Sequence, residues 1–318
     1  MTATKGSIIL ASDYNPIQTA VAKILGSGYI GSAGTLYGSG YGQTLASSQA
    51  VAGYIGSQTR TGTLIAASSG SIANLVSDIK KIAGHQGTTI TLPNTLANYS
   101  TANLKTIAAN DFTTLTSIVN TLFTSRFNIA AGQFSYETLS TGTRTTAWGG
   151  GSSSLSHSIT VTFANADTAR WFFIAGGKIQ FSASRTGGSN TSQNSNWATM
   201  LADMGVITLN YNSTSSSNAS QTGTIQSSIG WFNLTTSPTT IYSHVGTSRY
   251  STNSYTLSVA RDSGSTQLII SITFLDAHTS VWSDTVDGTL TSYIVSLRPS
   301  GANVNIAAPT VNLPTVAM

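Results

Sequence analysis

The sequence predicts an α+β protein that is mainly β, with an N-terminal helical docking region followed by an antiparallel, jelly-roll-like β-sandwich. Three observations predict this class. Apolar residues recur at helical spacing within residues 13–122, whereas from residue 155 onward they alternate with polar residues in short runs bounded by Asn, Asp and Gly. Between the two patterns lies a stretch rich in Gly, Ser and Thr, which is typical of a linker. We therefore expect a helical region at 1–127, a linker at 128–156, a sandwich at 157–306 and an extended tail at 307–318.

The helical region contains three stretches with one apolar face. The first covers residues 13–25, the second runs from Ser71 to a stop at Gly84, and the third begins at Asn110. The first and third share a polar cap, an aromatic residue and an apolar stripe at a constant offset, either as an internal repeat or because capped amphipathic helices resemble one another. A short helix cannot bury its stripe alone. We therefore expect these faces to meet each other or a partner.

The stretch 155–185 is predicted to form the centre of the sandwich core. Alternating residues indicate a strand on either side of a dense aromatic cluster, which we interpret as the seed of the core. An Asp and an Arg just before the cluster are interpreted as a structural pair at the turn, and Trp197 begins a predicted short helix inside the sheet domain. The signature residues of this part are Asp167, Arg170, Trp171, Phe172, Phe173 and Trp197.

Seven further runs alternate at close spacing and predict short strands. Turn residues such as Asp262-Ser263-Gly264-Ser265 separate them, and this spacing favours an antiparallel sandwich over βαβ units. The tail contains Pro309 and Pro314 and is predicted to be extended, with donation to a neighbouring subunit as one option. The predicted strands are 206–211, 224–234, 239–245, 255–260, 267–274, 289–297 and 304–306.

The composition favours assembly. Charged residues make up only 8% of the chain, against about 25% in an average protein, and Ser and Thr fill the shortfall. An isolated domain normally needs more surface charge for solubility, so we expect a cyclic homo-oligomer, with a trimer or hexamer preferred. The net charge of +4 comes from scattered basic residues, which argues against nucleic-acid binding. The absence of cysteine, of an export signal and of a long apolar run argues against disulfides and membrane insertion.

Motifs and residue spacing predict no catalytic site, cofactor or metal. Gly26–Gly31 matches G-x-G-x-x-G, but it follows a helix and opens none, so it lacks the context that a dinucleotide needs. The four histidines form no spaced pair. The best remaining lead is the group of Asp276, Asp284 and Asp287 around Trp282, which could serve a depolymerase. Asp in a turn is, however, common for backbone reasons alone.

Aromatic residues near predicted turns suggest a role in adhesion. Trp231, Trp282 and Tyr250 are candidate glycan contacts, because an aromatic ring beside amide and hydroxyl donors can hold a sugar. The same side chains could instead close the ends of the sandwich core. Under the first interpretation, the partner is a host-surface polysaccharide.

One segment carries a more specific signal. Its residues are Ala164–Phe173, Gly176–Ile179, Phe181–Arg185 and Trp197. They resemble a domain of virion structural proteins of tailed bacteriophages, cyanophages and other aquatic phages among them. Shorter matches to the same family, at its N-terminal part and its closing strands, are Asp13–Asn15, Tyr41–Thr44, Asp287–Leu290 and Arg298–Gly301. The resemblance spans most of the chain, implies a tail-fibre-like or virion structural role, and brings no catalytic residues with it.

We therefore expect a structural subunit of a phage virion, made in the host cytoplasm and placed on the particle as a tail, neck or fibre appendage. Its partners would be further copies of itself and other virion proteins. A host-surface glycan-binding adhesin and a capsid decoration protein remain alternatives, with a depolymerase as the third. The leading interpretation is a protein that is not an enzyme and needs no cofactor.

Overall fold

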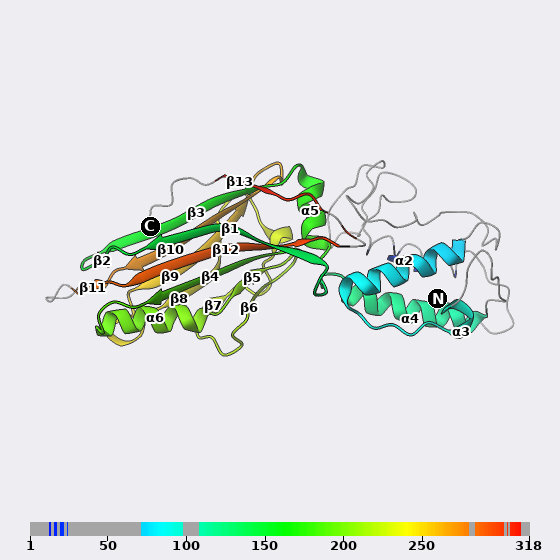
Figure 1. Cartoon of the computed structure of the whole chain (residues 1–318), viewed down its shortest axis with the longest axis horizontal. Coiled ribbons are helices and arrows are strands. Elements are labelled where there is room, and N and C mark those ends of the chain that lie inside the picture. Colours follow the sequence, from blue (N-terminus) through cyan, green and yellow to red (C-terminus); the bar gives the residue numbers. More distant parts are fainter. Residues whose placement is uncertain are drawn as a thin grey trace. The chain divides into compact units, whose positions relative to one another are not determined.

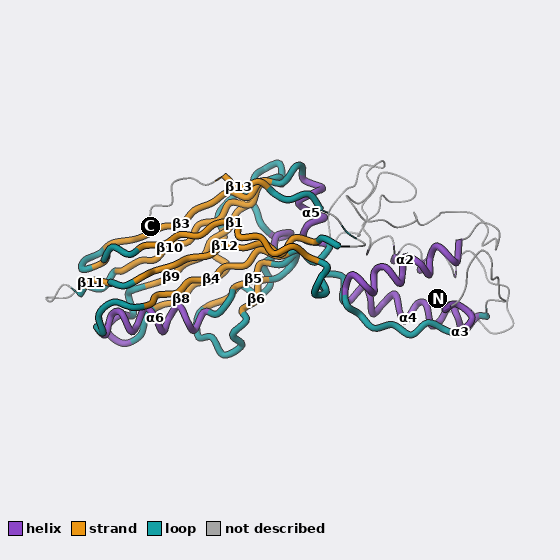
Figure 2. The backbone as a smooth tube through the Cα atoms, viewed as in Figure 1, coloured by secondary structure: helices purple, strands orange, loops and turns teal. Residues whose placement is uncertain are grey.

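The computed structural model describes residues 71–97, 108–279, 284–301, 304 and 306–312, together with 13, 16, 17, 20, 21 and 24. These residues fall into two compact units (Figures 1 and 2). The helical unit comprises the described residues of 1–134, 174–176 and 299–306. The sandwich unit comprises those of 135–173, 177–298 and 307–318.

The helical unit contains α2 (Ser71–Gln86), α3 (Asn94–Ala97) and α4 (Ala109–Thr124), and the six described residues between 13 and 24 are also helical. The prediction that the apolar stripes meet one another is confirmed, because buried residues of the first stretch, of α2 and of α4 contribute to one core. Asp111 fixes the start of α4, since its carboxylate accepts hydrogen bonds from the Ala108 backbone N–H at 2.7 Å and the Thr95 hydroxyl at 2.8 Å. The buried core residues are Ile17, Val21, Ile24, Leu75, Val76, Ile79, Ile82, Ala83, Leu96, Phe112, Leu115, Ile118, Val119 and Leu122.

α2 runs past its predicted stop. Gly84 stays helical, and the helix ends after Gln86, where Gly87 adopts φ 68°. A left-handed residue just beyond the last turn is a common helix end and strongly favours glycine. Of the two glycines near the end of this helix, Gly87 and not Gly84 terminates it.

The sandwich unit contains the two large antiparallel sheets expected for a mainly β fold. The five-stranded sheet has the order β1-β12-β4-β5-β6, and the six-stranded sheet has the order β13-β3-β10-β9-β8-β7. A small third sheet pairs β11 with β2. The strands are β1 (Phe134–Arg144), β2 (Trp148–Gly149), β3 (Ser153–Thr162), β4 (Lys178–Thr186), β5 (Ile207–Leu209), β6 (Thr214–Ser216), β7 (Thr224–Ile225), β8 (Thr239–Val245), β9 (Ser254–Arg261), β10 (Gln267–Asp276), β11 (Thr285–Val286), β12 (Thr289–Pro299) and β13 (Thr310–Asn312).

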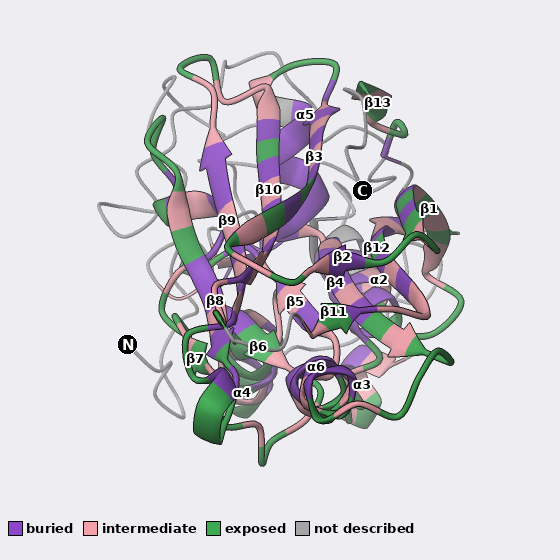
Figure 3. Cartoon of the chain, turned by 90° about the vertical axis from the view of Figure 1, so that its left-hand side faces the viewer, coloured by how far each residue is buried: buried purple, intermediate pink, exposed green. Residues whose placement is uncertain are grey.

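The alternation of the sequence sets which face of each strand is buried. Figure 3 shows it as purple bands separated by pink or green ones along β9 and β10. The register places Ile270 of β10 opposite Ile159 of β3 and Val259 of β9, and none of the three is more than 1% exposed. One face of the six-stranded sheet is therefore continuous core.

The prediction of a linker at 128–156 is wrong over most of its length. That stretch contains β1, β2 and the start of β3, and the boundary between the compact units lies at Phe134. β1 escaped detection because it is the edge strand of its sheet, and its two buried positions hold Ser140 and Gly142 instead of large apolar residues. Hydrophobic periodicity has no signal to find in such a strand.

The aromatic cluster is confirmed as core, although a helix carries it. α5 (Ala166–Ile174) lies between β3 and β4, and the Asn165 side chain caps it by accepting the Thr168 backbone N–H at 2.8 Å. The cluster residues Trp171, Phe172 and Phe173 are at most 1% exposed, as is Trp197 on α6 (Ser192–Met204).

Arg170, the other signature residue of α5, is fully buried. Its guanidinium lies 4.6 Å from the centroid of the Trp171 ring, within the range of a cation–π contact. The side chain of Asp167 lies outside the described residues, so its pairing with Arg170 stays a prediction.

Four of the seven predicted strands, those at 239–245, 255–260, 267–274 and 289–297, are confirmed as β8, β9, β10 and β12. The run 206–211 shortens to β5, and the run 224–234 divides into β7 and a 3-10 turn, η2 (Trp231–Asn233). The run 304–306 is not a strand at its described residues. The tail does not leave the subunit at β13, which pairs antiparallel with β3 of the same chain.

Candidate functional site

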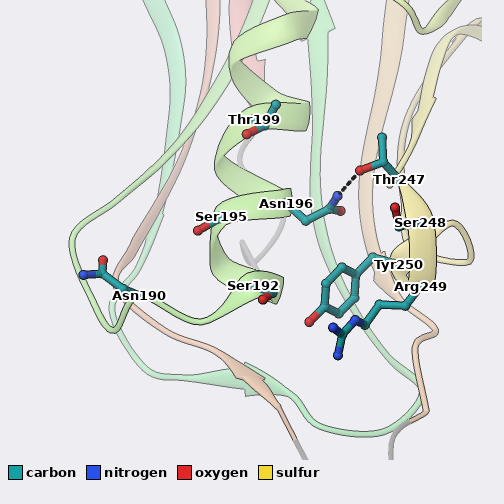
Figure 4. Close-up of a pocket in the computed structure, with 9 residues that line it drawn as sticks. All are labelled: Asn190, Ser192, Ser195, Asn196, Thr199, Thr247, Ser248, Arg249 and Tyr250. Carbon is teal, nitrogen blue, oxygen red and sulfur yellow. Dashed lines mark hydrogen bonds between the residues drawn. The ribbon is translucent and has the colours of Figure 1, made fainter.

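A polar pocket of about 440 Å³ lies between α6 and the turn after β8 (Figure 4). One wall is the first two turns of α6, and the other is Thr247 with the 3-10 helix η3 (Ser248–Tyr250). All the lining side chains are polar. They are Asn190, Ser192, Ser195, Asn196, Thr199, Thr247, Ser248, Arg249 and Tyr250.

The helical repeat of α6 explains its wall of the pocket. The lining positions 192, 195, 196 and 199 follow the spacing i, i+3, i+4 and i+7, so they share one face of the helix. Positions 197, 200, 201 and 204 belong to the opposite, buried face. Thr191 caps the helix by accepting the Asn194 backbone N–H at 3.2 Å. An amphipathic helix thus buries its apolar side and presents hydroxyls and an amide to the pocket.

A hydrogen bond joins the two walls. Asn196 Nδ2 donates to Thr247 Oγ1 at 2.8 Å, drawn as the dashed line in Figure 4. Gly246 permits the close approach, because a Cβ there would lie 2.3 Å from the Tyr250 carbonyl oxygen and 2.5 Å from Asn196 Oδ1. Ser248 adopts φ 53°, a conformation uncommon outside glycine. These contacts set the spacing of the two walls.

The positive charge at the pocket belongs to Arg249. It is exposed, its guanidinium lies 5.8 Å from the centroid of the Tyr250 ring, and it makes no ion pair with any carboxylate of the described residues. Tyr250 is only 3% exposed and donates its hydroxyl hydrogen bond to Asp284 at 3.2 Å. Burial, followed by the charge of Asp284, raises the pKa of Tyr250. The phenol therefore stays neutral at physiological pH.

A smaller pocket of about 160 Å³ continues along α6. It shares Asn196, Thr199 and Thr247 with the larger pocket and adds Asp203 and His244 to its lining. The two pockets are neighbours along α6, and the Asn196–Thr247 hydrogen bond lies among the residues that they share. We refer to the two adjoining pockets together as the groove along α6.

Asp203, His244 and Thr222 bring an acid, an imidazole and a hydroxyl together in the smaller pocket. His244 Nε2 lies 2.8 Å from Asp203 Oδ2 and 3.2 Å from Thr222 Oγ1, while Nδ1 lies 2.8 Å from the Val245 carbonyl oxygen. A nucleophile triad needs the acid on one ring nitrogen and the hydroxyl on the other. Here both occupy Nε2, so His244 cannot accept the Thr222 proton while the acid orients its ring.

The cluster instead stabilises a carboxylate. The backbone N–H of Thr222, at 2.8 Å, and then His244 hold the pKa of Asp203 below its usual range. The three residues bind the end of α6 to β8 and to the segment before β7.

A second hydroxyl–histidine pair, this time with a serine, lies in the core. Ser140 Oγ and His157 Nε2 are 2.6 Å apart, and both residues are at most 5% exposed. No described carboxylate contacts His157, whose Nδ1 has no hydrogen-bond partner in the described structure. Burial lowers the pKa of His157 and keeps the ring neutral. A substrate cannot reach this pair, so it serves packing.

The three predicted acids serve separate structural contacts. Asp276 is fully buried and accepts hydrogen bonds from Gln193 Nε2 at 2.7 Å and the Gly150 N–H at 3.3 Å, and burial raises its pKa. Asp284 accepts from Tyr250, as described above. Asp287 pairs with Arg185 at 3.1 Å and accepts from the Ser189 hydroxyl and N–H, which lower its pKa. The described residues also contain no group of three or more metal-ligating side chains.

Of the three aromatic residues predicted as glycan contacts, one is buried in the core, one lines the polar pocket and one lies outside the described residues. The prediction of Trp231 as a glycan contact is wrong, because η2 places its ring in the core, 1% exposed and stacked on Phe173 with centroids 5.4 Å apart. Tyr250 lines the polar pocket, so its role as a contact stays a prediction. Trp282 lies outside the described residues.

Sequence reasoning missed Asn196, Thr247 and Arg249. The hydroxyl and amide spacing on the exposed face of α6 was a usable signal for the first of these. The other two could not be found, because a turn 51 residues away reaches Asn196 only through tertiary packing.

The chain is a mainly antiparallel β-sandwich protein with a helical unit and a polar pocket beside α6. Comparisons with protein-family models, with curated proteins and with solved structures find no match for the chain. No described helix is both long and apolar enough to cross a membrane.

Proposed function

We propose that this protein is a structural subunit of a tailed-phage virion, a tail, neck or fibre appendage that assembles as a homo-oligomer. The resemblance of residues 164–197 to virion structural proteins supports the first part of the proposal. The second part rests on one structural observation, which is the outer face of the six-stranded sheet.

That outer face, named here the hydroxyl face, carries rows of Ser and Thr across neighbouring strands. Thr273 of β10 lies opposite Ser156 of β3 and Thr256 of β9. In the next row, Ser271 lies opposite Ser158 and Ser258, and Ser258 Oγ is 3.0 Å from Thr240 Oγ1 of β8. All five outward positions of β3, from Ser154 to Thr162, are Ser or Thr.

A face of this composition suits contact with another copy of the chain. Burying a charge in an interface costs several kcal/mol unless it is paired, on the order of the penalties measured for protein interiors, whereas hydroxyls exchange water for hydrogen bonds across the interface. Ile269, 38% exposed, adds an apolar contact on the same face. β13 pairs with β3 at residues 160–162 only, and the proposal places association on the face and not at the rest of that edge.

Light scattering of the purified protein tests the assembly. We expect the wild type to be an oligomer, and Ser271→Lys with Thr273→Lys to be a monomer, because the two lysines place unpaired charge in the interface. The matched control is Thr141→Lys with Thr143→Lys, which adds the same charge at exposed positions of β1 in the other sheet. If the Ser271→Lys, Thr273→Lys protein remained an oligomer and the Thr141→Lys, Thr143→Lys protein became a monomer, the hydroxyl face would not be the interface.

Location on the particle is tested separately. Purified particles labelled with an antibody against the protein are expected to show it by electron microscopy at a fixed position on the tail, neck or fibre. A protein that remains monomeric at high concentration and is missing from purified particles would overturn the proposed function.

A further inference from the structure

The groove along α6 has the chemistry of a carbohydrate site. Every side chain lining the larger pocket carries a hydroxyl, an amide, a phenol or a guanidinium. Hydroxyls and amides both donate and accept hydrogen bonds, which matches a ligand whose own surface is covered by hydroxyl groups. The larger pocket has no aliphatic residue in its lining and so offers no depression for an apolar peptide side chain.

The length of the groove indicates an oligosaccharide in preference to a single sugar. The two pockets share Asn196, Thr199 and Thr247, and their linings on α6 extend from Ser192 to Asp203. Eleven helical steps correspond to about 16 Å along the helix axis, which is longer than one sugar ring.

The smaller pocket supplies the apolar surface that the larger one lacks. Met200 and Val245 belong to its lining, and Val245 is 55% exposed although it is a large apolar residue. A sugar ring has an apolar face formed by its C–H groups, and this face can pack against such a surface. The groove therefore combines hydrogen-bonding groups at one end with an apolar contact at the other.

The positive charge of Arg249 favours a ligand that carries a negative charge. It is exposed at the rim of the larger pocket and forms no ion pair among the described residues. The lining of the larger pocket contains no carboxylate, and Asp284, which contacts that lining, is engaged by the Tyr250 hydroxyl. The one acid that lines the smaller pocket, Asp203, is engaged by His244 and by the Thr222 N–H. A guanidinium binds a carboxylate through two parallel hydrogen bonds.

We propose that this groove binds an acidic oligosaccharide of the uronic-acid type, with Arg249 pairing to a sugar carboxylate and the hydroxyls and amides of α6 and η3 binding its hydroxyl groups. On a virion subunit such a site would serve attachment to an acidic polysaccharide. The proposal concerns the isolated protein, so its outcome is independent of whether the chain is found on particles.

Calorimetric titration of the full-length protein with oligogalacturonate, and with a neutral oligosaccharide of equal length, tests the proposal. We expect the acidic ligand to bind, the neutral ligand to bind at least about tenfold more weakly, and binding to weaken as salt is raised. Arg249→Ala should lose about tenfold in affinity, whereas Arg249→Lys should lose less. Arg144→Ala removes the same charge from β1 outside the pocket and is expected to bind like the wild type.

A blocking variant separates the groove from the rest of the surface. Ser195 is exposed on the pocket wall, and Ser195→Trp should fill the larger pocket and abolish binding while leaving the unfolding midpoint unchanged. Equal binding of acidic and neutral ligands, or full affinity in Arg249→Ala or in Ser195→Trp, would overturn the proposal. Tighter binding of poly-glutamate than of oligogalacturonate would assign the groove to an acidic peptide and overturn it as well.

Discussion

The turn between β9 and β10 depends on one carboxylate, which makes Asp262→Ala an informative perturbation. Asp262 Oδ1 accepts the backbone N–H groups of Thr266 at 2.7 Å and Gln267 at 2.6 Å. Oδ2 accepts the Gly264 N–H and the Thr266 hydroxyl, each at 3.1 Å. Ser265 in the same turn holds φ 56°, a conformation that the peptide adopts at a cost. The hydrogen bonds to Asp262 therefore hold the hairpin in register.

The expected magnitude follows from these four bonds. A typical hydrogen bond contributes about 1 kcal/mol net, and one to a charged group about 1.5–3 kcal/mol. Asp262 is partly exposed, so water replaces part of each bond, and we expect Asp262→Ala to lower the free energy of unfolding by about 2–3 kcal/mol. Asp262→Asn keeps an oxygen for Thr266 and Gln267 and should cost about 1 kcal/mol. Ser263→Ala, at an exposed position of the same turn, should stay within about 0.5 kcal/mol of the wild type.

Urea unfolding followed by tryptophan fluorescence measures these differences. Partial burial acts to raise the pKa of Asp262, but its hydrogen bonds to Gln267, Thr266 and Gly264 outweigh burial and lower it. The carboxylate therefore contributes fully above about pH 4, and its contribution is lost as the pH falls through the lowered pKa. The gap between wild type and Asp262→Ala should narrow in acid. Equal stability of the two at pH 7, or an Asp262→Asn variant as unstable as Asp262→Ala, would refute the reasoning.

Two further variants test the cores of the two units. Ile79→Ala removes a fully buried side chain of α2 and should lower the free energy of unfolding in urea by about 3 kcal/mol. Asn120→Ala, on the exposed side of α4, should leave it nearly unchanged. Similar unfolding midpoints for the two variants would argue against the helical core. Asp276→Asn should change the pH dependence of stability, because burial raises the pKa of Asp276 and the wild type loses stability as the pH rises from about 4 to that raised value. The stability of the variant relative to the wild type should therefore increase as the pH rises from about 4 through the raised pKa of Asp276, and parallel profiles would contradict this.

Hydrophobic periodicity in the sequence correctly predicted the buried faces of several helices and strands. Ile17, Ile79 and Leu115 belong to three stripes that were separate in the sequence, and each is buried in the same helical core. β10 follows its predicted alternation closely, because its inward positions hold Leu, Ile and Phe while Ser271 and Thr273 face outward. In both cases one face of the element is strongly apolar. Burial of that face determines the orientation of the element.

Other residues show where periodicity fails. β1 was invisible because an edge strand with Ser140 at a buried position has no apolar pattern. The aromatic cluster of α5 was found, but its conformation was not, because a short run of apolar residues fits a helix and a strand equally well. Trp231 looked like an exposed ring near a turn, and a single 3-10 turn rotates it into the core.

Local composition and period are enough to predict the mainly β class, the helical core, the aromatic cluster of the sandwich core and the shortage of charge on the surface. The groove along α6, in contrast, arises from tertiary packing. Asn196 and Thr247 are 51 residues apart, and Gly246 allows the walls on which they lie to approach. Hydroxyls and amides carry no periodic signal of their own, so only the packing of α6 beside the turn after β8 reveals that they converge.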